Sequence, residues 1–217
     1  MKNIIVMGDS FCACDGWPEI LANNLNLKLI KYGFPGHSWW IVRKTLKTLS
    51  AEDIINCEII IFVHTSAARL LSSSDKVART DWSNPKTEID HAVHSYLKHI
   101  YDHEVHAWAQ DMWFKEINEA WKNCKVLHVF GFAPENDNIN ILTNGVCVLP
   151  TLSSISLNEI DAKEFNLAND KRFNHLNEYN NEILAEQLFE FIKNYKQGKM
   201  DLDMSKFKLL TNRWFGK

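Results

Sequence analysis

Short apolar runs alternate with amphipathic helical patterns along this chain, and this alternation constrains its fold more than any other feature. The runs expected to form buried strands cover residues 4–7, 27–32, 59–63, 125–130 and 145–149. Apolar residues at helical spacing follow several of these runs, at residues 17–25, 38–49 and 177–197. Strands that alternate with helices predict an α/β fold, with a parallel sheet and helices on both faces. Folds of this kind hold their chemistry at the carboxyl ends of the strands.

One long stretch, residues 66–124, interrupts the alternation. Its first part includes Ser72-Ser73-Ser74-Asp75 and is expected to be a loop, whereas apolar residues recur at helical spacing from Ile89 onward. We therefore predict a loop and a helical insertion after the third strand. The sequence has no internal repeat and no linker that would divide it. Residues 1–199 are predicted to form one domain, and residues 200–217 a C-terminal tail without an assigned structure.

The composition excludes several classes of protein. A length of 217 residues, 46% of them hydrophobic, suits a globular chain with a sizeable core. The net charge of −3 gives no electrostatic reason to expect a nucleic-acid or membrane partner. No apolar run approaches the about 20 residues of a membrane span, and polar Asp9-Ser10 interrupts the N-terminal run too early for a signal peptide. The five cysteines have no regular spacing, which indicates reduced thiols and a cytoplasmic location.

A candidate nucleophile follows the first predicted strand. Gly8-Asp9-Ser10 comes directly after the apolar run 4–7, so Ser10 is expected in a tight turn above the carboxyl end of the sheet. A serine hydroxyl attacks a carbonyl efficiently only with the help of a base. The competing interpretation is that Gly-Asp-Ser is only a turn, because so short a motif also occurs by chance.

A candidate base precedes the last long helix. Asn174-His175-Leu176-Asn177 lies immediately before the helical pattern, with Asn177 as the expected cap. A histidine at a junction between loop and helix has a defined position, and its imidazole titrates in the range that a general base needs. The competing interpretation is a capping or surface histidine, since the chain has nine histidines.

These segments resemble blocks of the SGNH, or GDSL-like, hydrolase family and occur in the family's order. Gly8-Asp9-Ser10-Phe11 is similar to the first block, which supplies the nucleophile, and residues 33–38, Gly-Phe-Pro-Gly-His-Ser, are similar to the second. His175-Leu176-Asn177 and the helix after it are similar to the last block. The resemblance covers residues 3 to about 192 and implies a three-layer, flavodoxin-like sheet of about five strands. It also implies that the backbone N–H groups of Ser10 and Gly36 form an oxyanion hole.

Two positions depart from the family pattern. Where the family has an asparagine after the third strand, this chain has Thr65, whose hydroxyl is a shorter donor to the oxyanion. The family's triad acid lies three residues before the histidine, where this chain has Arg172, which cannot accept a hydrogen bond from an imidazole. Asp170 is the nearest acid before His175 and is the predicted replacement. Alternatively, a backbone carbonyl orients the base and the site is a dyad.

Three further side chains are candidates for substrate contact. Trp39 and Trp40 follow Gly36, and aromatic walls suit both sugars and acyl chains. Two adjacent residues of a helix cannot both point into the core, so one tryptophan is expected near the cleft. His64, which precedes Thr65 at the end of the third strand, is the third candidate.

The histidines of the insertion suggest a metal site, which is the less favoured interpretation. His99, His103 and His106 have helical spacing and are expected to share one helix face, where they could bind zinc. The chain has no His-Glu-x-x-His motif, and an exposed polar face explains these residues equally well. Cys12 and Cys14 lack Cys-x-x-Cys spacing and are interpreted as ordinary thiols. No metal and no cofactor are predicted.

Together these residues predict a serine esterase or acyl-hydrolase. Ser10 attacks an ester carbonyl, His175 moves the proton, and the N–H groups of Ser10 and Gly36, with the Thr65 hydroxyl, hold the oxyanion. The expected partner is a small-molecule or carbohydrate ester, with no nucleic acid and no membrane. The alternative is a catalytically weak SGNH-like protein that binds a ligand or partner through the same cleft, because Thr65 and Arg172 depart from the family.

Overall fold

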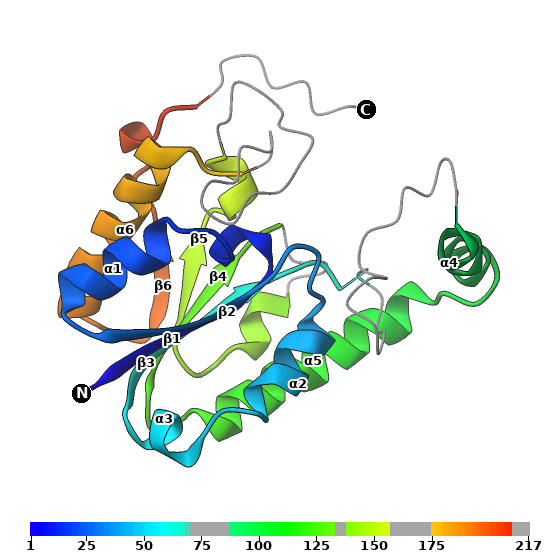
Figure 1. The fold of residues 1–217 in the computed structure, drawn as a ribbon, viewed down its shortest axis with the longest axis horizontal. Coiled ribbons are helices and arrows are strands. Elements are labelled where there is room, and N and C mark those ends of the chain that lie inside the picture. The colour runs from blue at the N-terminus through cyan, green and yellow to red at the C-terminus, as the bar shows by residue number, and fades with distance from the viewer. Residues whose placement is uncertain (68, 70–86, 133–137, 157–174, 210–217) are drawn as a thin grey trace.

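The chain forms a parallel six-stranded sheet with helices on both faces. The computed structural model describes residues 1–67, 69, 87–132, 138–156 and 175–209. The strand order in the sheet is β2-β1-β3-β4-β5-β6, and every neighbouring pair is parallel (Figure 1). The strands are β1 (Asn3–Gly8), β2 (Lys28–Gly33), β3 (Cys57–His64), β4 (Lys125–Phe130), β5 (Val146–Leu149) and β6 (Gly198–Asp201). The predicted α/β class and parallel sheet are confirmed, with one strand more than expected.

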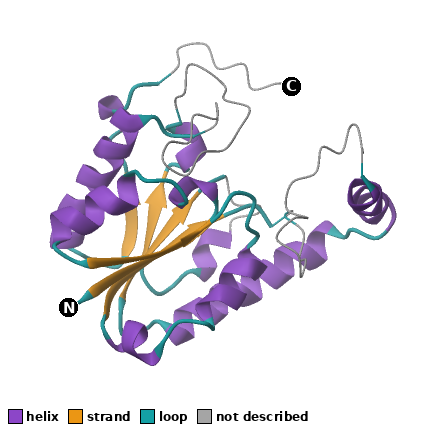
Figure 2. Cartoon of the chain, in the orientation of Figure 1, coloured by secondary structure: helices purple, strands orange, loops and turns teal. Residues whose placement is uncertain are grey.

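Two layers of helices enclose this sheet. Figure 2 shows helices on either side of the strands. Helices α1 (Trp17–Leu25) and α6 (Glu178–Lys193) pack together on one face, and α2 (Trp39–Leu46) and α5 (His103–Ala120) pack on the other. The remaining elements are α3 (Ala51–Ile55), α4 (Glu88–His99) and the 3₁₀ turns η1 (Ser10–Cys12), η3 (Asn138–Ile141), η4 (Leu152–Ser154) and η5 (Met204–Lys206). None of these described helices combines the length and apolar sequence needed to cross a membrane.

The continuous apolar runs of the central strands follow from burial on both faces. In β1, Ile4 and Val6 join the hydrophobic cluster below α1 and α6, whereas Ile5 and Met7 join the cluster below α2 and α5. All four side chains are fully buried. Because successive residues of a strand point to opposite faces, a strand covered on both faces has few polar positions. This is why the sequence pattern identified β1, β3 and β4.

The predicted insertion contributes one helix to the body of the fold. Helix α5 connects β3 to β4 and buries Trp113, Phe114 and Ile117 against the sheet. Helix α4 buries only Val93 and extends away from the sheet (Figure 1). The helical insertion after the third strand is therefore present, and its second helix is the crossover that a parallel β3–β4 pair requires.

The residues after α6 add the unexpected strand. The helix predicted to continue to Gly198 ends at Lys193, and Gly198 begins β6, which pairs with β5 from Val146 onward. The predicted domain boundary at residue 199 falls inside β6. Only Met200 of this edge strand is buried, so the sequence has no apolar run there from which a strand could be predicted.

Candidate active site

Ser10 lies at the carboxyl end of β1, in a turn that its neighbours hold in place. Asp9 caps η1 by accepting a hydrogen bond from Phe11 N to its Oδ1, at 3.1 Å. A Cβ at Gly8 would lie 2.5 Å from the Cβ of Val63, so only glycine lets β1 and β3 approach this closely beneath the turn. The motif Gly8-Asp9-Ser10 is thus explained by packing and capping, and it aims Ser10 at the edge where an α/β sheet holds its chemistry.

His175 meets Ser10 from the other end of the chain. The imidazole Nε2 lies 2.8 Å from Ser10 Oγ, although the two residues are 165 positions apart. Both side chains are buried, with 3% and 5% of their surface exposed. The Phe11 ring stacks on the imidazole, with ring centroids 4.6 Å apart and planes inclined by 19°. A nucleophile within hydrogen-bond distance of a base whose plane is fixed by stacking has the geometry for proton transfer.

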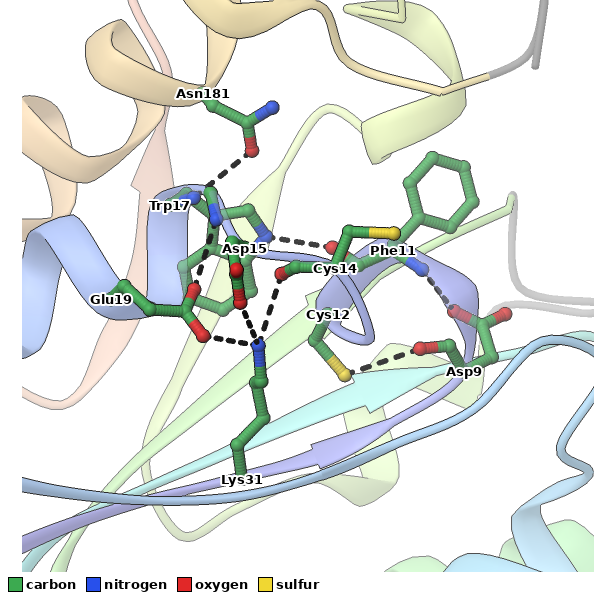
Figure 3. A network of polar contacts seen from close by, with 10 residues as sticks. Asp9, Phe11, Cys12, Cys14, Asp15, Trp17, Glu19, Lys31 and Asn181 are labelled. Carbon is green, nitrogen blue, oxygen red and sulfur yellow. Dashed lines mark hydrogen bonds and ion pairs between the residues drawn. The ribbon is translucent and has the colours of Figure 1, made fainter. Parts of the chain in front are cut away.

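Asn181 joins the two segments that carry Ser10 and His175. Its Oδ1 accepts a hydrogen bond from Trp17 N at 3.0 Å (Figure 3). Its Nδ2 donates to the carbonyls of Leu176 and Asn177 at 3.3 and 3.0 Å. Trp17 in turn donates from Nε1 to Phe11 O at 2.8 Å. The turn after β1 and the start of α6 are therefore tied together through one amide. Asn180-Asn181 in the first turn of the helix was the available signal, because asparagine is a poor helix former.

Charged side chains around Lys31 lie beside the site, near the turn that Asn181 holds. Lys31 Nζ forms an ion pair with Glu19, approaches Asp15 Oδ1 at 3.5 Å, and donates to Cys14 O at 3.1 Å (Figure 3). Burial, with the nearby Asp9 carboxylate, raises the pKa of the Cys12 thiol well above its usual value. Cys12 is therefore a neutral thiol and serves as a small buried side chain. None of the five cysteines forms a disulfide bond.

A cavity of about 360 Å³ opens beside the pair. Its walls come from the turn after β1, the start of α1 and the start of α6, and include Ser10 and His175. Four carboxylates also line it, those of Asp15, Glu19, Glu178 and Glu182. Lys31 balances part of this charge through Asp15 and Glu19, whereas no ion pair to Glu178 or Glu182 occurs among the described residues. The cavity is thus open to a small molecule and bears a negative charge.

The predicted oxyanion donors lie in defined local structures. Gly36 has φ +81°, and His37 N donates to Phe34 O at 3.1 Å. This is the conformation of a type II turn, in which glycine is favoured at the third position. Thr65 is buried, its carbonyl accepts a hydrogen bond from Gln110 Nε2 at 2.9 Å, and its hydroxyl has no hydrogen-bond partner in the described part of the chain. Of the three predicted donors, only Ser10 lines the cavity described above, so the part of Gly36 and Thr65 in an oxyanion hole stays a prediction.

The predicted substrate-binding aromatics lie on the opposite side of the sheet. Trp39 is buried in the cluster below α2 and α5, and the half-buried Trp40 packs beneath the Arg43 guanidinium, 5.2 Å from its ring centre. His64 is 4% exposed and hydrogen bonds to His128 in the core. None of the three lines the cavity described above. Their contact with substrate stays a prediction, and for His64 the core location gives it no support.

Two further expectations concern the acid and the insertion. Asp170 and Arg172 lie outside the described residues, so the identity of the group that orients His175 stays a prediction. The expected single face for His99, His103 and His106 is wrong, because His99 ends α4 and His103 begins α5. His106 is buried and its Nε2 lies 3.0 Å from the Tyr96 hydroxyl. Within the described ranges, no three His, Cys, Asp or Glu side chains gather as a metal site would require.

Comparisons with models of protein families, with curated proteins and with solved structures find no match to this chain. The class that the fold and site define is therefore an α/β protein with a hydrogen-bonded serine–histidine pair at the carboxyl edge of its parallel sheet.

Proposed function

We propose that this chain is a serine hydrolase of the SGNH type that cleaves carboxylic esters. The observation that carries the proposal is the 2.8 Å contact between Ser10 Oγ and His175 Nε2 beside an open cavity. Serine alone is a weak nucleophile, and a neighbouring imidazole is the base that most often activates it. A buried serine–histidine hydrogen bond also occurs for structural reasons, but a structural pair does not need a cavity at the reacting atoms.

The proposed reaction has two steps that these residues can perform. Ser10 Oγ attacks the ester carbonyl carbon while its proton passes to His175 Nε2, and the protonated imidazole then gives that proton to the departing alcohol. The acyl group remains on Ser10. In the second step a water molecule attacks the acyl carbon with His175 as base, and the acid and free Ser10 are regenerated. No cofactor enters either step.

Charge on the carbonyl oxygen develops next to the backbone of Ser10. We assign its stabilisation to the N–H groups of Ser10 and Gly36 and to the Thr65 hydroxyl, as in the family this sequence resembles. The unpartnered, buried Thr65 hydroxyl supports this assignment. One donor of an oxyanion hole contributes about 10²–10³ in rate.

The cavity narrows the substrate class within this proposal. A volume of about 360 Å³ is in the range of small-molecule sites, which suits a small-molecule or carbohydrate ester. Glu178 and Glu182 lie on the same face of the first turns of α6 and disfavour an ester that carries its own negative charge. A cytoplasmic location is part of the proposal and agrees with five cysteines that form no disulfide bond.

An activity-based probe tests the proposal directly. A fluorophosphonate reacts with an activated serine by losing fluoride, and we expect it to label the wild-type protein on Ser10. Ser10→Ala should abolish labelling, and His175→Ala should slow it by at least about 10³-fold. Ser95→Ala, which removes an exposed serine of α4, is the matched control and should label normally.

The same measurement separates the enzyme from the binding module. Labelling of wild type that is lost in Ser10→Ala, together with turnover of a short-chain ester, supports the hydrolase. A folded wild-type protein that neither labels nor turns over such an ester contradicts it and favours ligand binding in the same cavity.

A further inference from the structure

Arg69 makes contacts to two loops beside the proposed site that no part of the mechanism has used. It follows the end of β3, and its backbone N donates to Ser66 O at 3.3 Å. Its Nη2 lies 3.2 Å from Asp9 Oδ2, and its Nη1 donates to His37 O at 2.8 Å. One guanidinium thus binds the turn after β1 and the turn after β2, from the segment after β3.

The contact with Asp9 is buried and carries charge. The Asp9 side chain is fully buried, and the Arg69 side chain is 19% exposed. The Phe132 ring covers the guanidinium, with its centre 5.6 Å from Arg69 Cζ. A buried carboxylate requires a partner, and Arg69 supplies its charge to Asp9 while the same planar guanidinium donates in a fixed direction to His37 O. A lysine ammonium in its place could neutralise Asp9 but lacks the second, fixed N–H direction.

The three segments joined in this way are those that carry the proposed oxyanion donors. Asp9 precedes Ser10, His37 follows Gly36, and the backbone contact to Ser66 lies next to Thr65. We propose that Arg69 is a positioning residue that holds the oxyanion donors of these three segments in register for transition-state stabilisation. The inference rests on the proposed hydrolase function and goes beyond it by naming a group outside the catalytic pair.

The ion pair also has an electrostatic consequence for the proposed reaction. An uncompensated Asp9 carboxylate next to Ser10 would oppose negative charge that develops on the substrate oxygen. Arg69 balances that carboxylate in the ground state, so the field at the oxyanion is set by the N–H donors. Loss of Arg69 should therefore lower kcat more than it changes KM, because the negative charge on the substrate oxygen is absent from the bound ester and develops only as the reaction proceeds.

The principal test is Arg69→Lys, which keeps the charge and removes the fork. We expect kcat for a short-chain ester to fall about 10- to 100-fold with KM changed less than about threefold, and fluorophosphonate labelling to slow in parallel. Arg43→Lys is the matched control, because Arg43 also forms an ion pair, with Glu116, but on α2 away from the serine–histidine pair. It should leave kcat unchanged. Wild-type kcat in a folded Arg69→Lys protein overturns the inference.

A second comparison keeps the inference falsifiable if loss of the buried charge prevents folding. Asp9→Asn retains the acceptor for Phe11 N, and the double variant Asp9→Asn/Arg69→Met then leaves no unpaired charge. We expect the double variant to be at least about tenfold slower than Asp9→Asn alone, because the contact to His37 O is lost. Equal rates would refute a positioning role. An inactive, unlabelled wild type defeats the hydrolase proposal and this inference together, whereas an active wild type with no effect at Arg69 defeats the inference alone.

Discussion

Two buried histidines predict a measurable loss of stability in mild acid. His64 Nε2 lies 2.9 Å from His128 Nδ1, and His128 Nε2 lies 2.8 Å from Asn144 O. Because a carbonyl only accepts, His128 donates from Nε2 and accepts from His64 on Nδ1, which is an arrangement of two neutral rings. Burial lowers the pKa of His128 to about 4, and burial together with the neighbouring His128 lowers the pKa of His64 well below its usual value.

The sign and size of the effect follow from proton linkage. Below pH 6.5 the unfolded chain binds a proton at residue 128, whereas the folded protein does not do so until about pH 4. The contribution of His128 to the free energy of unfolding is therefore constant above about pH 6.5 and falls as the pH decreases from about 6.5 to about 4. With folded and unfolded pKa values of about 4 and about 6.5, His128 alone costs about 2 kcal/mol by pH 5 and about 3 kcal/mol by pH 4. His64 acts in the same direction.

Urea unfolding at a series of pH values measures this effect. His128→Gln retains an amide that can donate to Asn144 O and does not titrate. Between pH 7 and pH 4 the free energy of unfolding should therefore fall by about 3 kcal/mol less in His128→Gln than in wild type. His94→Gln, a change at an exposed residue of α4, should leave the pH dependence as in wild type. If wild type and His128→Gln have parallel stability profiles over this range, the assignment of a neutral buried pair is refuted.

Three further predictions concern the site and the core. Thr65→Val should lower kcat by at least about tenfold with little change in KM, since it removes one oxyanion donor, and an unchanged kcat in steady-state assays would restrict the hole to backbone groups. Asn181→Leu leaves Trp17 N without its acceptor, and it should lower the free energy of unfolding by about 1–3 kcal/mol and also reduce kcat. Loss of stability alone, seen in urea titrations and ester assays of the same variant, would argue against a role in joining Ser10 to His175. Leu188→Ala on α6 removes a fully buried side chain and should cost about 2–5 kcal/mol in urea unfolding, and a cost below 1 kcal/mol would contradict its place in the core.

The predicted and missed strands differ in a simple physical respect. Residues 59–63 form an unbroken apolar run because β3 is covered by helices on both faces, and the run identified the strand. Strand β6 has the sequence Gly-Lys-Met-Asp and lies at the sheet edge with one buried side chain. Strand β6 is held in the sheet by backbone pairing with β5, and backbone pairing does not produce a pattern of polar and apolar side chains.

The sequence predicted the two candidate catalytic residues of the site, but it did not predict the contacts that join the surrounding segments. Ser10 follows a strand and His175 precedes a helix, and both positions could be inferred from neighbouring residues alone. Arg69 follows β3 with no motif around it, and its partners Asp9 and His37 belong to other segments. Trp39 and His64 lie close in sequence to Gly36 and Thr65, but both belong to the core on the other face of the sheet.

Local features could be inferred from the sequence: most of the strands and helices, the positions of several turns, and the candidate nucleophile and base. Burial, capping and turn formation depend on residues a few positions apart, so their patterns can be read along the chain. The tertiary structure alone decided that His175 lies 2.8 Å from Ser10, that Asn181 joins their segments, and that β6 completes the sheet. Such contacts depend on the distance and direction between atoms of remote segments, which strand order and helix packing set and no local pattern records.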